Sequence, residues 1–188
     1  MDSRVRNAMG RVDRARFLPP HARRDADFDA PIAIGYGQTN SQPFTVSYML
    51  SLLDVHPGHR VLDVGSGSGW TSALLRELGG DVHAVELVPE LVEFGQENLR
   101  STGYDDVTVH QAVDGVFGLP DLAPFDRILV SAEADEIPQE LIDQLKIGGL
   151  MVIPVSGRML LVERLSEDES AVTRHGDFRF VPLLRSRG

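Results

Sequence analysis

Short apolar runs alternate with amphipathic segments through the middle of the chain. The apolar runs predict five strands, at 60–64, 81–85, 107–109, 125–130 and 150–153. Between them, apolar residues recur at helical spacing, and proline stands where a helix start tolerates it. The predicted helices are Trp70–Leu78, Pro89–Leu99 and one from Pro138 to about Leu145 that Gly148 and Gly149 cap. Strands that alternate with helices predict an α/β fold, in which a largely parallel sheet is covered on both faces.

The two ends of the chain depart from this alternation. The chain up to about Asp29 predicts a helix followed by irregular chain, and Pro31–Pro43 predicts a loop. Apolar residues at helical spacing then predict a helix at Pro43–Leu53. Near the other end, Met159–Leu165 and Phe178–Leu184 predict two strands joined by a polar, acidic turn. Because no helix separates these strands, they predict an antiparallel hairpin at one edge of the sheet.

Composition narrows the possible functions. A chain of 188 residues, 42% of them hydrophobic, predicts a single domain at 1–188. No apolar run is long enough for a membrane span and the first residues lack a signal-peptide core, so we predict a cytoplasmic protein without a membrane partner. The net charge of −10 argues against nucleic acid as a partner. The chain has no cysteine and its histidines lack ligand spacing, so we predict no metal site.

A glycine-rich turn, VLDVGSGSG at Val61–Gly69, follows the first of these strands. Glycine suits such a turn because a Cβ would block both the turn and the approach of a ligand to the backbone. Dinucleotide sites have G-x-G-x-x-G, and Trp70 stands where their third glycine would be. This spacing disfavours a nicotinamide oxidoreductase. The structural alternative is a turn in which glycine only relieves strain.

Acidic residues stand near the ends of three successive predicted strands. Asp63 precedes the glycines, Glu86 ends the second strand, and Asp114 follows the third. Ligands of open parallel sheets bind at the carboxyl ends of the strands, so the three acids predict one site. Glu86 is placed to accept both ribose hydroxyls of an adenosine. The alternatives are an ordinary surface acid for Glu86 and a turn-initiating aspartate for Asp114.

Two motifs carry a resemblance to known families. The G-x-G-x-G turn preceded by Asp63 resembles motif I of the class I methyltransferases. The sequence IGYGQTNSQP at Ile34–Pro43 resembles the G-x-G-Q-T-I-S-x-P signature of the protein-L-isoaspartate O-methyltransferases, and FVPL at Phe180–Leu183 agrees with the same family. The similarity covers most of the chain from about residue 8. It implies a Rossmann-like doubly wound sheet, with N-terminal helices and a substrate loop at 1–53, a cofactor-binding core at 60–154 and C-terminal strands at 157–184.

The resemblance also implies an activity. It is methyl transfer from S-adenosylmethionine to the free carboxylate of L-isoaspartyl residues in damaged proteins or peptides, which is a protein-repair reaction. We expect the protein to be a monomer. Ser41 would be the catalytic hydroxyl that orients the acceptor carboxylate, unless it is only the N-cap of the next helix. The substrate would contact Asn40, Ser41, Phe180 and Val181. The implied cofactor-binding residues are Gln38, Thr39, Asp63, Gly65, Ser66, Gly67, Gly69, Glu86, Leu87, Val113 and Asp114.

Three departures from the family pattern keep alternatives open. Asn40 replaces an apolar residue of the signature, and Val113 replaces a glycine before the acid. Glu133 and Asp135 stand where the family has small, apolar or proline residues; if Glu133 faced the cleft it would repel an anionic acceptor, and otherwise both side chains point to water. One alternative is therefore a methyltransferase of the same family that acts on another carboxylate, such as a biosynthetic peptide. The other is a catalytically silent S-adenosylmethionine-binding module, against which the intact glycine turn, Glu86 and Ser41 argue.

Overall fold

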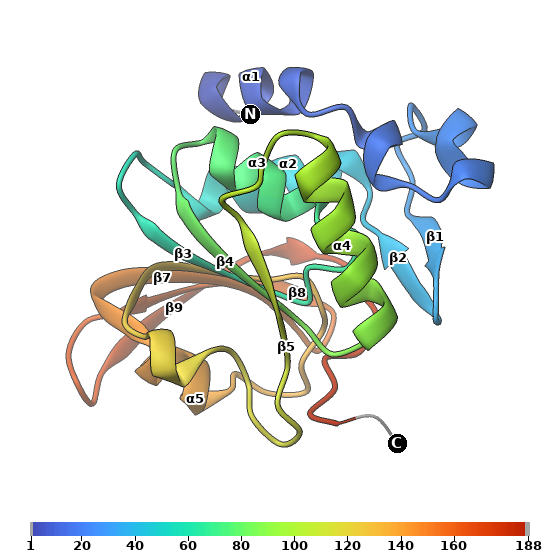
Figure 1. Cartoon of the computed structure of the whole chain (residues 1–188). Helices are drawn as coiled ribbons and strands as arrows, with labels where there is room; N and C mark the ends of the chain where they lie inside the picture. Colours follow the sequence, from blue (N-terminus) through green and yellow to red (C-terminus); the bar gives the residue numbers. More distant parts are fainter. Residues whose placement is uncertain (1, 187–188) are drawn as a thin grey trace.

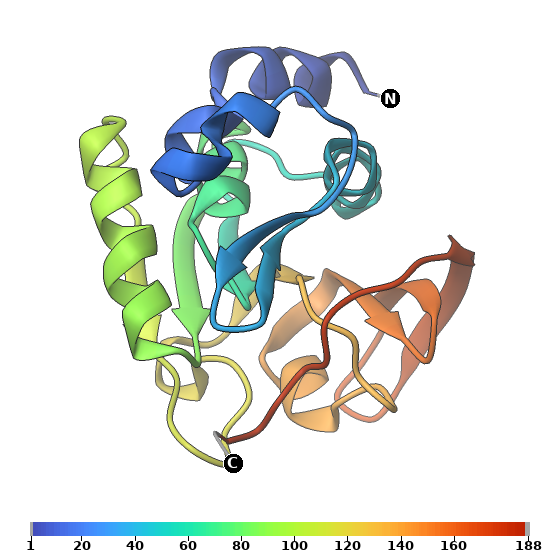
Figure 2. The ribbon, with the colours of Figure 1, turned by 90° about the vertical axis from the view of Figure 1, so that its right-hand side faces the viewer.

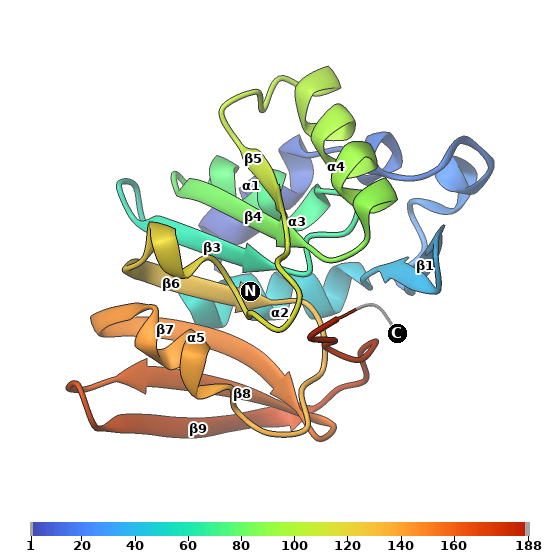
Figure 3. The same ribbon diagram turned by 60° about the horizontal axis from the view of Figure 1, so that its bottom comes forward.

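A seven-stranded sheet runs through the protein in the order β5-β4-β3-β6-β7-β8-β9 (Figure 3). The computed structural model describes residues 2–186. The strands are β3 (Arg60–Val64), β4 (Asp81–Glu86), β5 (Thr108–Gln111), β6 (Phe125–Val130), β7 (Leu145–Val155), β8 (Arg158–Arg164) and β9 (Ser170–Asp177). Neighbours from β5 to β7 are parallel, whereas β7, β8 and β9 pair antiparallel. The predicted α/β fold, mostly parallel with antiparallel C-terminal strands, is confirmed.

Helices cover both faces of the sheet, and the N-terminal helix lies over one of these layers (Figure 1). They are α1 (Ser3–Arg11), α2 (Pro43–Leu53), α3 (Trp70–Glu77), α4 (Pro89–Ser101) and α5 (Gln139–Asp143), with 3-10 turns η1 (Arg14–Phe17), η2 (Pro20–Asp25) and η3 (Pro120–Leu122). Within residues 2–186 there is no helix of the length and apolarity that a membrane crossing requires.

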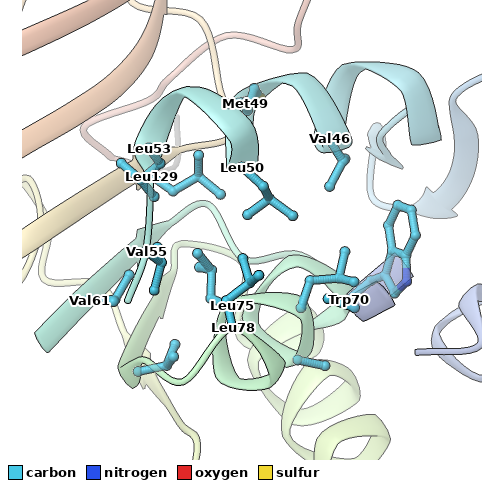
Figure 4. Packing of buried hydrophobic residues seen from close by; sticks show 14 of the residues in the cluster. Val46, Met49, Leu50, Leu53, Val55, Val61, Trp70, Leu75, Leu78 and Leu129 are labelled. Carbon is cyan, nitrogen blue, oxygen red and sulfur yellow. The ribbon is translucent and has the colours of Figure 1, made fainter. Parts of the chain in front are cut away.

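Alternating side chains of β3 assign the two faces. Val61 belongs to the core beneath α1, α2 and α3, whereas Leu62 and Val64 belong to the core on the α5 side. Leu50 of α2 and Leu75 of α3 belong to the same core as Val61 (Figure 4). Each side chain of this size contributes roughly 1.5–3 kcal/mol to stability when fully buried. This alternation also decides where the polar residue of β3, Asp63, points.

The N-terminal third contains more regular structure than its sequence predicted. Helix α1 ends at Arg11, and the rest of this segment forms the two 3-10 turns η1 and η2. The segment predicted as a loop at Pro31–Pro43 contains a two-stranded antiparallel hairpin, β1 (Ile32–Gly35) and β2 (Gln38–Asn40). Because its glycines and polar residues hide the strand pattern, the prediction of a loop was wrong here. Helix α2 was predicted with its observed bounds.

The C-terminal half holds two further corrections. Strand β7 begins at Leu145, so Gly148 and Gly149 lie within it, at an irregularity in its pairing with β6, and do not cap a helix. The second strand of the predicted hairpin is β9 at Ser170–Asp177, not Phe178–Leu184. Strand β9 is a sheet edge with mostly exposed side chains, so it lacks an apolar signature. The apolar segment at 178–184 instead crosses back over the carboxyl ends of the strands (Figure 2).

Candidate functional site

The candidate site lies where the chain reverses its direction of progress across the sheet. From β3 the chain moves outward to β4 and β5, and it then returns to place β6 on the other side of β3. Ligands of such sheets bind in the crevice at this switch point. The first residue after β6, Ser131, donates its backbone N–H to the Val64 carbonyl at the end of β3 (2.9 Å). The turns after β3 and β6 therefore form the floor of the site together.

A cleft opens at this point, which we call the main cleft. It encloses about 710 Å³ of space not filled by atoms, counting its open mouth. The walls combine polar groups with apolar side chains from the 112–118 loop and the C-terminal segment. Seven of the residues predicted to bind cofactor or substrate line it: Gln38, Thr39, Gly65, Gly67, Glu86, Leu87 and Val181.

Glu86 is the acid of the main cleft. It ends β4 and is only 7% exposed. One carboxylate oxygen, Oε2, accepts the Gly67 N–H at 2.9 Å, and Oε1 accepts the N–H groups of Leu87 (2.7 Å) and Val88 (2.9 Å). Three backbone donors thus hold the carboxylate at the cleft and tie it to the glycine-rich turn. Lone pairs of Oε2 remain for a ligand hydroxyl, since an ionised carboxylate has about four acceptor positions.

The glycines of the turn have different tasks. Gly67 has a φ of 53°, and a Cβ there would lie 3.2 Å from Ile34 Cδ1 of the hairpin. Gly69 lines none of the cavities of the site; a Cβ there would lie 3.0 Å from the Gly95 carbonyl oxygen, so this glycine lets α3 pack against α4. Ser66 between them is 4% exposed, and its hydroxyl has no partner within residues 2–186. A buried hydroxyl without a partner is a ready contact for a polar ligand.

Asp63 lies behind the site and does not line any of its cavities. Its side chain is on the same face of β3 as Val61, the face that α3 covers, and it is fully buried. Its Oδ2 accepts a hydrogen bond from the Ser72 hydroxyl of α3 at 2.6 Å. Burial raises the pKa of Asp63 to about 6, and the nearby Glu86 charge acts in the same direction. Its position suits it to hold α3 behind the turn rather than to touch a ligand.

Asp114 and Val113 are also absent from the main cleft. Both are exposed, in a turn closed by the Val116 N–H, which donates to the Val113 carbonyl. The neighbouring residues Phe117 and Gly118 line the cleft instead. This is the geometry of the turn-initiating alternative, and a role of Asp114 in cofactor binding stays a prediction.

Two smaller cavities adjoin the main cleft beside Ser41. The inner cavity lies between the hairpin and the glycine-rich turn, and the outer cavity lies between the start of α2 and the C-terminal segment. Ser41 lines both, and its hydroxyl forms no hydrogen bond within residues 2–186. The N-cap of α2 is Gln42, whose own side chain does not cap the helix, and Asp29 Oδ1 accepts the Phe44 N–H of the first turn at 2.8 Å. The capping alternative for Ser41 is therefore excluded, and its hydroxyl remains available to a ligand.

The unusual Asn40 has a structural partner. Its side chain is 5% exposed; its Oδ1 accepts from Arg14 Nε at 2.7 Å, and its Nδ2 donates to Ser68 Oγ at 3.0 Å. Arg14 also donates to the Ser41 carbonyl and lies 5.3 Å from the Trp70 ring centroid. Burial lowers the pKa of Arg14 to about 10. Asn40 thus links the hairpin to the glycine-rich turn, and its polarity is used inside the protein.

Glu133 is occupied by the fold as well. Its Oε1 accepts the Gly157 N–H at 3.1 Å, and its backbone pairs on both sides with the C-terminal segment, through Val181 and Leu183. It lines none of the three cavities, so it does not oppose an anion there. Glu133 is half-buried and the turn after β7 supplies a donor to one of its oxygens, so its side chain is directed to water only in part; Asp135 is exposed as predicted.

Two residues of the site were not predicted. Ser131 lines the main cleft and both smaller cavities, as does Thr39. Ser131 directly follows the buried strand β6, and this position was the sequence signal that could have identified it. Arg179 lines the outer cavity with Phe180 and Val181, the two predicted substrate contacts. Of the described residues that line the outer cavity, none is an Asp or Glu. Within residues 2–186 no group of three His, Asp or Glu side chains is arranged to hold a metal ion.

Known proteins of similar sequence share one family description. The family described as protein-L-isoaspartate(D-aspartate) O-methyltransferase matches residues 1–188. A protein-L-isoaspartate O-methyltransferase from Methanopyrus kandleri is 46% identical over 99% of this chain and 85% of its own length. One from Aeropyrum pernix is 47% identical over 98% of this chain and 74% of its own length.

Solved structures give the same result for the fold. A Plasmodium falciparum protein described as a protein-L-isoaspartate O-methyltransferase, in complex with S-adenosyl-L-homocysteine, superposes with a TM-score of 0.84. It is 26% identical over 98% of this chain and 92% of that chain. A second structure of a protein-L-isoaspartate O-methyltransferase, 24% identical over 97% of this chain and 61% of that chain, superposes with a TM-score of 0.85 and shows the shared fold.

Proposed function

Because this chain belongs to the protein-L-isoaspartate(D-aspartate) O-methyltransferase family, we propose that it methylates the free α-carboxylate of L-isoaspartyl residues in damaged proteins or peptides. The methyl donor is S-adenosylmethionine. The backbone amide nitrogen then displaces methanol from the methyl ester to form a succinimide, which hydrolyses partly to normal aspartate. The single observation that carries the proposal beyond the family is the outer cavity, where Ser41, Ser131 and Arg179 stand without any carboxylate among the described lining residues.

The main cleft fits the cofactor. We assign the ribose hydroxyls to the remaining lone pairs of Glu86 and the methionine end to the region of Ser66, whose buried hydroxyl has no partner in the described chain. Leu87, Val116 and Phe117 offer apolar walls for the adenine. Gly65 and Gly67 leave the turn open to a ligand, with Thr39 of the hairpin opposite.

The reaction asks for alignment more than for proton transfer. The cofactor supplies a sulfonium-activated methyl group, and the acceptor carboxylate is already ionised at neutral pH. No general base is therefore needed, and Ser41 acts by donating a hydrogen bond that orients the carboxylate. The positive sulfonium and the negative carboxylate both lose their charge as the methyl group moves. Exclusion of water from the cavities around Ser41 and Ser131 therefore favours the transfer.

The two structural partners found above weaken the alternative acceptor. Asn40 and Glu133 prompted the idea of a different carboxylate substrate, yet Arg14 and Gly157 account for their polarity. The free Ser41 hydroxyl and the intact turn argue against a silent module. We also propose that the protein acts as a cytoplasmic monomer on protein or peptide, not nucleic acid, in keeping with its net charge of −10.

Incubation with radiolabelled S-adenosylmethionine and a pair of peptides tests the proposal. One peptide contains an isoaspartyl residue, and its twin contains aspartate at the same position. We expect label in a base-labile ester of the first peptide only. A protein that binds S-adenosylhomocysteine in calorimetry but leaves the isoaspartyl peptide unlabelled acts on another acceptor.

A further inference from the structure

The outer cavity contains an unpaired positive charge. Arg179 is exposed at the cavity wall, and its side chain forms no hydrogen bond or ion pair with any residue between 2 and 186. Among the described residues that line this cavity, it is the one cation. The chain has a net charge of −10, so carboxylates outnumber basic side chains elsewhere in it, whereas the outer cavity is lined by this guanidinium and by no carboxylate of the described residues. The guanidinium attracts an anion to this part of an otherwise acidic protein.

The backbone around Arg179 is held from both sides. The ring of Phe178 stacks on Tyr48 of α2, with centroids 5.6 Å apart, and Phe180 packs against the core beneath α2. The Phe178 N–H donates to the Gly157 carbonyl at 2.9 Å, and the Val181 carbonyl accepts the Glu133 N–H at 2.8 Å. The fold therefore anchors the neighbours of Arg179 and leaves its guanidinium exposed beside the cavity. The segment runs past the β1–β2 hairpin that carries Ser41 (Figure 2).

We propose that Arg179 is a specificity-determining residue, which binds the isoaspartyl α-carboxylate in its ionised state and so selects an anionic acceptor. This inference rests on the proposed function. The planar guanidinium suits a carboxylate because its N–H groups match the two oxygens. Ser41 then orients the same group from the hairpin side.

The chemistry predicts which kinetic constant depends on Arg179. The acceptor is an anion before methyl transfer and a neutral ester afterwards. Attraction to Arg179 is therefore full in the bound substrate, weaker in the transition state and absent in the product. A contact of this kind strengthens substrate binding without accelerating the methyl-transfer step, so its loss raises KM and leaves kcat unchanged or slightly higher. Because Arg179 is exposed, solvent screens the pair, and we expect a change of about three- to tenfold.

The test compares Arg179→Gln with Arg174→Gln on the same intact chain. Arg174 is exposed on β9, lines none of the three cavities and has no side-chain partner among the described residues, so its variant makes the same change of net charge elsewhere. The probe is an isoaspartyl peptide with uncharged flanking residues. Binding is measured by calorimetry with S-adenosylhomocysteine present, and kcat and KM by label transfer at low and high salt.

We expect Arg179→Gln alone to weaken peptide binding and raise KM about three- to tenfold, to abolish most of the salt dependence of KM, and to keep kcat. Arg179→Lys should recover part of the loss. Equal binding by Arg179→Gln and wild type, or a fall in kcat at unchanged KM, overturns the inference. A loss seen only with acidic flanking residues also overturns it, because Arg179 would then bind the flank. A wild-type protein that binds the isoaspartyl peptide no better than its aspartyl twin overturns the proposed function instead.

Discussion

Replacing Glu86 by glutamine separates the two tasks of this carboxylate in the main cleft. Oε2 accepts the Gly67 N–H, whereas Oε1 accepts those of Leu87 and Val88. A glutamine carbonyl can keep the second pair of hydrogen bonds, but its NH₂ group would face the Gly67 donor and cannot accept from it. One charge-assisted hydrogen bond is lost, and two lose their charge. The ribose hydroxyls lose their proposed anionic acceptor at the same time.

The expected loss of cofactor affinity follows from these contacts. A hydrogen bond to a charged group is worth about 1.5–3 kcal/mol, and water at the cleft mouth recovers part of that. We therefore expect Glu86→Gln to weaken S-adenosylhomocysteine binding by about 1–3 kcal/mol, or roughly five- to 150-fold in Kd. Calorimetry measures the change directly. The increase in melting temperature at a fixed ligand concentration should shrink in parallel.

A matched variant guards against a general charge effect. Glu93 is exposed on α4 and lines none of the three cavities, so Glu93→Gln removes the same charge away from the site. It should bind S-adenosylhomocysteine like the wild type. Wild-type affinity in Glu86→Gln would remove Glu86 from the binding site. Equal losses in both variants would assign the effect to net charge and would refute the contact.

Three further predictions concern the acceptor and the pH dependence of stability. Ser41→Ala should slow methylation about ten- to a hundredfold, because one orienting hydrogen bond to an ion is lost, while S-adenosylhomocysteine affinity in calorimetry stays the same; a wild-type rate would exclude the role. Burial raises the pKa of Asp63 to about 6, so the stability it contributes is complete below pH 4 and is lost as pH rises through 6. Asp63→Asn should therefore gain about 1.4 kcal/mol relative to wild type in urea unfolding between pH 5 and 7.5, the worth of one pKa unit, and a constant difference would contradict the assignment. Burial lowers the pKa of His83 and of the adjacent His110, so the protein loses the stability that the two neutral imidazoles contribute as pH falls below about 6.5. Replacing both histidines by phenylalanine should therefore flatten the pH dependence of the melting temperature between pH 7.5 and 5.5.

The central strands and helix α2 were predictable because their local signals agree with their burial. Strand β3 and strand β6 have the predicted bounds, since both are mostly buried in a parallel sheet, are rich in Val, Leu and Ile, and are followed by a glycine or a serine. The carboxyl ends of these strands then follow from topology alone. Ser131 was within reach of the same reasoning, because it directly follows β6 at the switch point.

The C-terminal segments were not predictable in the same way, because an apolar pattern reports burial and not pairing. Strand β9 has only β8 as a neighbour and exposes most of its side chains, so its sequence is polar. The apolar residues of 178–184 pack across the site, where Phe180 reaches one core and Leu183 the other. The polar sequence of β9 therefore concealed a strand, and the apolar sequence of 178–184 suggested a strand of the sheet where the chain instead crosses the site.

In the site, too, features that depend on local sequence were predictable, whereas features that depend on distant residues were not. The positions of Asp63 and Glu86 near the ends of their strands predict that both lie near the cleft. Whether either side chain can contact a ligand depends on the direction in which it points, which the sequence alone does not give. Asp63 faces α3, and Glu86 faces the cleft. The family departures depend on partners still farther away: Arg14 lies 26 residues before Asn40, and Gly157 lies 24 residues after Glu133. A motif read along the chain contains neither partner. The departures at Asn40 and Glu133 therefore looked like a change of substrate, although each side chain has a hydrogen-bond partner inside the protein and neither places a carboxylate among the described residues that line the outer cavity.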